Sequence, residues 1–443
     1  MTRDEAQALT KKILGFAKVP ECEVRVTVSR RGFLRFARNQ ATTAGATDAA
    51  SIQVTAWKGK RRATVTGSFD VSPDGLDEAA IKKLVADAEQ LAAISPEDRE
   101  YMPLLGPQEY AEVDAFDEET AAATAAVRAA RIRDAIAYAK ARKIVAAGFL
   151  DQSSTFYAVA NSAELFAYFP STSVGFSMTA RTLDAAGSGY SSIRSNSFSG
   201  LDVGEAAAMA IRKAIASRGA SELKPGEYPT ILEAQAVGDL LPTVSFSARL
   251  ADEGRSVFSA PEGKTRVGEK MFDERIRLHT DPAHPLVPAS PIGPGGYPAG
   301  KADLVRGGVL KNLENSRYWA QQKKRSPGPF LSNLILEGED QPLSKIIAST
   351  KRGVLVTRLW YIRTVDRQQA LMTGLTRDGT FWIEDGEIAR PIKNFRFNES
   401  MVRVLGEIEA LGSPVRVGSR RGSVRVPPMR VSSFRFTSLS DAV

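Results

Sequence analysis

Histidine, the residue type that most often performs acid–base or zinc chemistry, is scarce in this chain of 443 residues. Only two occur, His279 and His284, and Pro282 between them breaks any helix that could present both on one face. So small a supply favours neither a zinc site nor a histidine base. We expect the two histidines to lie on a surface loop.

The single cysteine and the common nucleophile and phosphate-binding motifs indicate a functional site no more strongly than the histidines do. Cys22 alternates with Val24 and Val26, which predicts a buried apolar thiol rather than a nucleophile. As the only cysteine, it excludes an intrachain disulfide. The segment 295–301 imitates a phosphate-binding loop, but Ala302 stands where Ser or Thr must hold magnesium. The Gly-x-Ser-x-Gly elbow of serine hydrolases does not occur.

The formal net charge of +8 raises the question of acidic partners such as nucleic acid. Acidic and basic residues are mixed along most of the chain, except in 416–435, which has no acid. There, Val424-Arg425-Val426 alternates as in a strand with arginines on one solvated face. Because no recognised nucleic-acid motif accompanies these arginines, we do not expect nucleic acid as a partner.

The residue pattern of the first half predicts groups of consecutive strands that are separated by helices. Amphipathic periodicity predicts helices over 4–18, 76–94, 117–143 and 203–218. Alternation predicts a strand over 22–28, a turn at Arg31-Gly32, and further strands over 33–36, 51–57, 62–68 and 145–190. This order is typical of an antiparallel meander covered by helices.

The composition changes at Lys224-Pro225-Gly226-Glu227, where short apolar strands broken by Gly and Pro begin to dominate. We therefore expect two domains, an N-terminal α+β domain over 1–222 and a strand-rich domain over 223–443. Because helices and strands are segregated rather than alternating as βαβ units, the predicted class is α+β. With no apolar run of eighteen residues, no secretory signal pattern and one cysteine, the chain is expected to be cytoplasmic and not to span a membrane.

Several short segments of the second half recur in the order and spacing of the TldD/PmbA family, which the chain resembles along most of that half. These segments are 225–232, 256–259, 307–311, 346–353, 381–388 and 390–393. The first half is similar in element order, including Trp57-Lys58-Gly59-Lys60, but more weakly.

The resemblance implies a degenerate metal site. Active TldD-type members carry His-Glu-x-x-x-His after the lead-in strand, where two imidazoles hold zinc and the Glu is the general base. Here Ala234 and Asp239 replace the histidines and Gln235 replaces the Glu. Arg421 stands where many relatives have a zinc-binding Cys. The resemblance therefore implies no catalytic residue and no metal in this chain, with Ala236-Val237-Gly238 kept as scaffold.

By the same resemblance, the chain is a PmbA/TldE-like subunit that does not cleave peptides by itself. Its expected partner in a heterodimer is a TldD-type metallopeptidase subunit, which supplies the zinc, and the expected substrates are unfolded peptides bound by strand addition. Two alternatives stay open. One is a homodimeric peptide- or regulator-binding protein without a catalytic partner, and the other is a hydrolase that uses Glu233 and Asp239 with a different metal.

Overall fold

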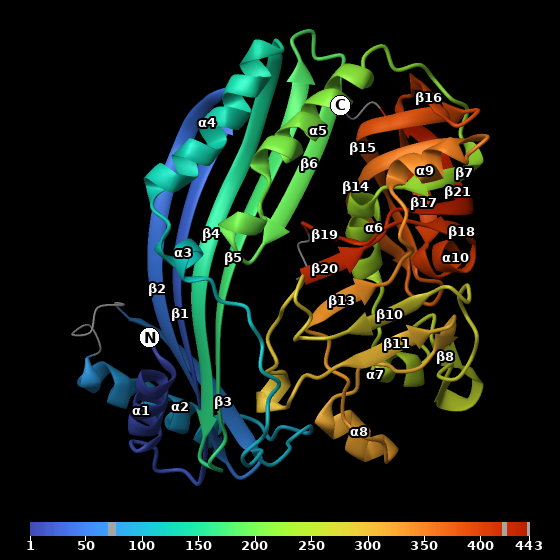
Figure 1. Cartoon of the computed structure of the whole chain (residues 1–443). Helices are drawn as coiled ribbons and strands as arrows, with labels where there is room; N and C mark the ends of the chain where they lie inside the picture. The colour runs from blue at the N-terminus through green and yellow to red at the C-terminus, as the bar shows by residue number, and fades with distance from the viewer. Residues whose placement is uncertain (70–76, 419–422, 441–443) are drawn as a thin grey trace.

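The computed structural model describes residues 1–69, 77–418 and 423–440 and confirms the predicted α+β class. A long, curved antiparallel sheet with helices forms the first half, and a compact group of shorter strands forms the second half (Figure 1). Among the described residues, no helix is long and apolar enough to cross a membrane.

The N-terminal sheet consists of two antiparallel meanders joined through their first strands, in the order β3-β2-β1-β4-β5-β6. Its strands are β1 (Glu21–Ala37), β2 (Gln40–Lys58), β3 (Arg61–Phe69), β4 (Ile144–Asn161), β5 (Phe166–Thr182) and β6 (Ser188–Ser195). The turn between β1 and β2 is made by Arg38 and Asn39, which both have positive φ, as a two-residue hairpin requires.

The predicted turn at Arg31-Gly32 is wrong, because β1 continues through it. Gly32 pairs with Ala46 on one side and with Gln152 on the other. A Cβ at Gly32 would collide with the guanidinium of Arg128. Glycine is therefore needed here to leave room for a buried arginine, which a sequence pattern cannot distinguish from a turn signal.

Helices cover one face of this sheet and leave the other face toward the second half (Figure 1). Most even-numbered residues of β1, such as Val24 and Leu34, are buried on the helix side, whereas Arg30 is exposed. Cys22 belongs to the same face and is fully buried, which confirms the predicted apolar thiol. The covering helices are α1 (Arg3–Leu14), α2 (Glu78–Ile94), α4 (Ala125–Ala141) and α5 (Val203–Ala216).

The helix predicted over 117–143 is two helices, α3 (Glu118–Ala122) and α4. The chain is extended at Ala123 and Thr124. Two buried side chains stabilise the break, because Gln152 Nε2 and Arg128 Nη1 both donate to the Ala123 carbonyl, at 3.1 and 3.2 Å. Arg128 is buried and also donates to Gln152 Oε1 at 2.7 Å.

The second half contains a closed set of strands and a six-stranded sheet. In the first, β14-β7-β21-β17-β15 follow one another, β14 also pairs with β15, and β16 and β18 attach to the outside. These strands are β7 (Gly226–Leu232), β14 (Arg352–Asp366), β15 (Leu371–Glu384), β16 (Glu387–Pro391), β17 (Asn394–Ser400), β18 (Ile408–Leu411) and β21 (Met429–Ser440).

The six-stranded sheet has the order β12-β11-β10-β13-β20-β19 and shares one hydrophobic core with the closed strands. Its strands are β10 (Arg277–Thr280), β11 (Ala302–Arg306), β12 (Val309–Leu310), β13 (Asn333–Leu336), β19 (Val415–Val417) and β20 (Ser423–Val426). The small pair β8 (Ser259–Ala260) and β9 (Lys264–Thr265) lies apart. The short helices are α6 (Ala234–Leu240), α7 (Ala248–Asp252), α8 (Arg317–Lys323), α9 (Leu343–Ala348) and α10 (Met401–Gly406).

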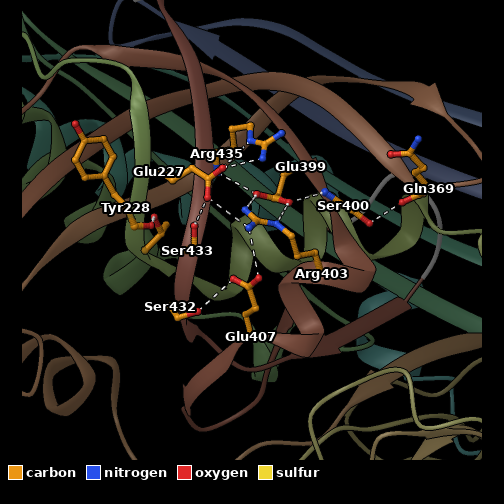
Figure 2. Close-up of polar contacts among 11 residues, drawn as sticks. Glu227, Tyr228, Gln369, Glu399, Ser400, Arg403, Glu407, Ser432, Ser433 and Arg435 are labelled. Atoms are coloured by element: carbon orange, nitrogen blue, oxygen red, sulfur yellow. Dashed lines mark hydrogen bonds and ion pairs between the residues drawn. The ribbon is translucent and has the colours of Figure 1, made fainter.

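A carboxylate–arginine cluster ties the closed strands together (Figure 2). The buried carboxylate of Glu399 accepts from Arg403 Nη2 at 2.6 Å and from the Arg435 backbone N–H at 2.9 Å. Arg403 also lies near Glu227 and Glu407, at 3.6 and 3.4 Å. Hydrogen bonding to Glu399 is the main cause of the raised pKa of Arg403. The cluster joins β7, β17, β21 and α10, so we regard it as structural.

Candidate functional site

The lead-in strand β7 delivers helix α6 to a fixed place beside β14. Residues 230–232 pair in parallel with 354–356, and the Glu233 backbone N–H then donates to the Val356 carbonyl at 3.0 Å. Glu233 is the N-terminal cap of α6, which begins at Ala234. The segment predicted to hold the degenerate site is thus a helix that follows a buried strand directly.

One face of α6 borders a cavity of about 890 Å³ between the two halves of the chain. That volume is within the range of ordinary ligand sites. From α6 the lining includes Gln235, Gly238 and Asp239, but not Ala234, which packs on the core. The other walls come from the helix-free face of the N-terminal sheet and from β14. Their side chains include Arg31, Phe149, Asp151, Tyr190, Ser192, Arg194, Arg358, Trp360, Tyr361 and Arg363.

The polar side chains of α6 are bonded to one another and to the backbone around them. Gln235 Nε2 donates to Asp239 Oδ1 at 2.8 Å and to the Gly418 carbonyl at 3.0 Å. The second oxygen of Asp239 accepts the Leu359 backbone N–H at 3.0 Å. The structure therefore brings Gln235 and Asp239 together, but as a hydrogen-bonded pair that fixes β14 and the end of β19 to the helix.

Glu233, the candidate partner of Asp239 in acid–base chemistry, has other contacts. Its carboxylate accepts from Lys213 Nζ at 2.7 Å and from Thr357 Oγ1 at 3.2 Å. Lys213 belongs to α5 in the first half, so this largely buried ion pair connects the two halves. The carboxylates of Glu233 and Asp239 therefore bind different groups, and Glu233 is not among the residues that line the cavity.

Gly238 allows α6 to approach the six-stranded sheet closely. A Cβ at this position would lie well under 3.0 Å from Cγ2 of Val417 and 3.4 Å from its Cβ. Because real Cβ atoms are almost never that close to another atom, a side chain here forces Val417 to move. The contact agrees with a scaffold role for the Ala236-Val237-Gly238 segment.

An arginine that sequence reasoning missed projects into the same cavity. Arg358 of β14 lies over the ring of Tyr190, 3.7 Å from its centroid, and over that of Trp360, at 4.8 Å. Its Nη1 is 3.4 Å from Asp378 Oδ2, and Asp378 Oδ1 accepts from Ser188 Oγ at 2.6 Å. Tyr190 and Ser188 come from β6, and Trp360 and Asp378 from β14 and β15. Because this group forms only when the two halves meet, no local motif could have revealed it.

The remaining sequence candidates lie elsewhere. His279 is not on a surface loop, since it belongs to β10, is 2% exposed, and has Nε2 2.8 Å from Glu337 Oε1. The Leu286 backbone N–H donates to His284 Nδ1. The segment 295–301 leads into strand β11 and not into a helix, so it lacks the geometry of a phosphate loop. Arg421 lies outside the described residues.

The described arginines at the C-terminal end of the chain are held by neighbouring groups. Arg425, Arg430 and Arg435 approach the carboxylates of Glu337, Glu409 and Glu227, at 3.4, 2.9 and 2.8 Å. Arg416 is different, because burial and the nearby Arg194 lower its pKa to about 10. These contacts favour the interpretation as strands with individually paired arginines and disfavour a basic patch that binds nucleic acid.

Comparison with known proteins gives matches in both halves. Residues 225–438 match the PmbA/TldA metallopeptidase C-terminal domain, and residues 22–92 match the PmbA/TldA metallopeptidase domain 1. A metalloprotease of Methanothermobacter thermautotrophicus is 26% identical over 226 residues. That match covers 46% of this chain and 47% of the relative, so the chain spans about half the length of the curated relative it matches.

Solved structures share the fold over almost the entire chain. TldE of Thermococcus kodakarensis superposes with a TM-score of 0.84 at 20% identity, covering 98% of this chain and 99% of that one. A candidate modulator of DNA gyrase from Thermotoga maritima gives 0.81 at 17% identity, covering 98% and 99%. A second candidate gyrase modulator, from Bacteroides thetaiotaomicron, gives 0.82 at 17% identity, covering 99% and 100%.

Proposed function

Since the chain belongs to the PmbA/TldD metallopeptidase family, we propose that it is the non-catalytic, PmbA/TldE-like subunit of a TldD-type zinc metallopeptidase complex acting on unfolded peptides. The observation that carries this proposal is the hydrogen bonding of Gln235 and Asp239 on α6. Where active members hold a base and a metal ligand, an amide and a carboxylate here bind each other and the protein backbone.

The side chains that the structure describes around α6 do not fit zinc. Structural and catalytic zinc sites take histidine nitrogen, cysteine sulfur and carboxylate oxygen, usually three or four together. Ala234 offers no donor atom, and the Gln235 amide directs its N–H toward the carboxylate of Asp239. Within the described ranges, no group of three or more His, Cys, Asp or Glu residues could hold a metal ion. We propose that the partner subunit supplies the catalytic zinc.

Peptide binding is supported by the cavity and by the strand at its wall. The cavity of about 890 Å³ offers room for a short segment of extended chain. β6 is the last strand of the N-terminal sheet in the described residues, and Tyr190, Ser192 and Arg194 from it line the cavity. A terminal strand presents backbone donors and acceptors that pair with an extended peptide of almost any sequence.

Peptide cleavage by the purified full chain tests the non-catalytic assignment. We expect no cleavage of an unfolded peptide with added zinc, and cleavage once the TldD-type subunit of the same organism is added. Cleavage by the chain alone that a chelator abolishes, and that Asp239→Asn also removes, would instead establish the hydrolase with a different metal. Glu97→Gln, a carboxylate-to-amide change outside the cavity lining, is the matched control.

A further inference from the structure

Arg358 is enclosed more completely than the other arginines of the cavity. It is only 8% exposed, yet it lines the cavity and lies over the rings of Tyr190 and Trp360. Two aromatic faces restrict the guanidinium to a narrow set of orientations, and cation–π contacts of this kind strengthen when water is excluded. The group is therefore positioned before any ligand arrives.

The guanidinium has more hydrogen-bond donors than its neighbours use. Arginine carries five N–H donors, but the one hydrogen bond found for Arg358 among the described residues is the 3.4 Å contact of Nη1 with Asp378. Its buried Nε has no partner in that part of the chain. Asp378, in turn, is bound more tightly by Ser188, at 2.6 Å. Nε is closed to a ligand, so an acceptor in the cavity would use the Nη donors that the contact with Asp378 leaves over.

The charge of the cavity also favours an anionic group. Its charged lining residues in the described ranges are Arg31, Arg194, Arg358 and Arg363 against Asp151 and Asp239. Asp151 is already shared by Arg31 and Arg194, at 3.7 and 3.5 Å, and Asp239 is bonded to α6 and β14. Within these ranges the lining is thus net positive, and the two carboxylates named here are engaged by the protein.

We propose that Arg358 is a carboxylate anchor, so that the cavity selects peptide segments that carry a carboxylate next to the bound backbone. The planar fork of arginine matches a carboxylate through two parallel hydrogen bonds. The carboxylate is either the free C-terminus of a peptide or an Asp or Glu side chain. This inference rests on the proposed peptide-binding function and adds a specificity determinant to it.

Binding of matched peptides to the full chain tests the anchor. Four versions of one short unstructured peptide are titrated by calorimetry: free C-terminal acid without acidic side chains, C-terminal amide, amide with one Glu, and amide with Gln in its place. We expect a carboxylate to strengthen binding by about tenfold or more over its neutral counterpart. The acid–amide pair reports on a C-terminal carboxylate, and the Glu–Gln pair reports on a side chain.

Two variants assign the effect to Arg358. Arg358→Lys keeps the positive charge beside Asp378 but loses the planar fork, so the preference for the carboxylate is expected to fall to about twofold or less. Arg352→Lys makes the same exchange at an exposed position of β14 outside the cavity lining and should keep the full preference. The wild-type comparison stands even if Arg358→Lys fails to fold.

The outcomes separate this inference from the function on which it rests. Tight binding of all four peptides to the wild-type chain without a carboxylate preference overturns the anchor and leaves peptide binding intact. If the folded Arg358→Lys variant keeps the preference for the carboxylate, another group is responsible for that preference and the anchor is also overturned. Absence of binding by any of the four peptides overturns both the anchor and the proposed peptide-binding function.

Discussion

Replacing Gly238 by alanine has two opposing effects on α6: it raises the helix propensity and it worsens the packing. Alanine gains about 1 kcal/mol over glycine inside a helix. Its Cβ, however, would lie well under 3.0 Å from Cγ2 of Val417, and overpacking of a filled core costs about 1–3 kcal/mol. Val417 is buried and β-branched, so its χ1 has few alternatives that would relieve the contact. Because this contact would be so short, the packing cost should lie in the upper part of that range, at about 2–3 kcal/mol, so we expect Gly238→Ala to lose about 1–2 kcal/mol of stability.

Urea unfolding followed by circular dichroism measures this loss as a lower midpoint at an unchanged slope. Gly204→Ala is the matched control, because its nearest new neighbour is Asp202 Oδ1 at an ordinary 3.4 Å and it should not destabilise. In a Val417→Ala background the cost of Gly238→Ala should shrink, since the clashing methyl is gone. A Gly238→Ala protein as stable as the wild type, with Gly204→Ala behaving as expected, refutes the close-packing explanation.

Three further predictions concern other parts of the chain. Arg128→Ala should cost about 2–4 kcal/mol of unfolding free energy, because it leaves a cavity and removes the donor to the buried Gln152 Oε1, whereas exposed Arg131→Ala should change stability by less than about 0.5 kcal/mol. Burial raises the pKa of Cys22 to about 12, so the native thiol should resist alkylation at pH 9 and react fully in urea. Because this pKa is raised on folding, the associated stability is complete below pH 9.0 and is lost as the pH rises toward 12. Arg403→Leu should destabilise by about 2 kcal/mol because it leaves Glu399 buried without its cation, and the added change Glu399→Leu should restore part of that loss in thermal unfolding.

Periodicity was sufficient to predict the fold class and most elements, because helices and strands with one buried face leave regular patterns. Alternation along 22–28 predicted both β1 and the burial of Cys22. The errors occur where a long-range contact decides the local conformation. Gly32 resembles a turn residue but makes room for Arg128, and the helix break at Ala123 is stabilised by Gln152 from a distant strand.

In the candidate site, too, sequence features could be predicted and long-range contacts could not. The resemblance to the TldD/PmbA family implied that 234–239 follows a lead-in strand and lacks the zinc-binding side chains, and the structure shows a strand at 226–232 followed by α6. Arg358 could not, because Tyr190 and Asp378 reach it from β6 and β15 across the boundary between the two halves. A guanidinium with unused donors in a cavity is a property of the folded chain, and the sequence around Arg358 reads as an ordinary strand.

The central claim is that the chain is the non-catalytic subunit of a metallopeptidase complex. The most direct test is to isolate the chain at its native level from its own cells and to identify the accompanying proteins by mass spectrometry. A subunit of a metallopeptidase complex that lacks zinc ligands must be found with the subunit that has them. We predict a partner in roughly equal amount whose sequence contains His-Glu-x-x-x-His. Recovery of the chain alone, or only with further copies of itself, would contradict the assignment as a non-catalytic subunit.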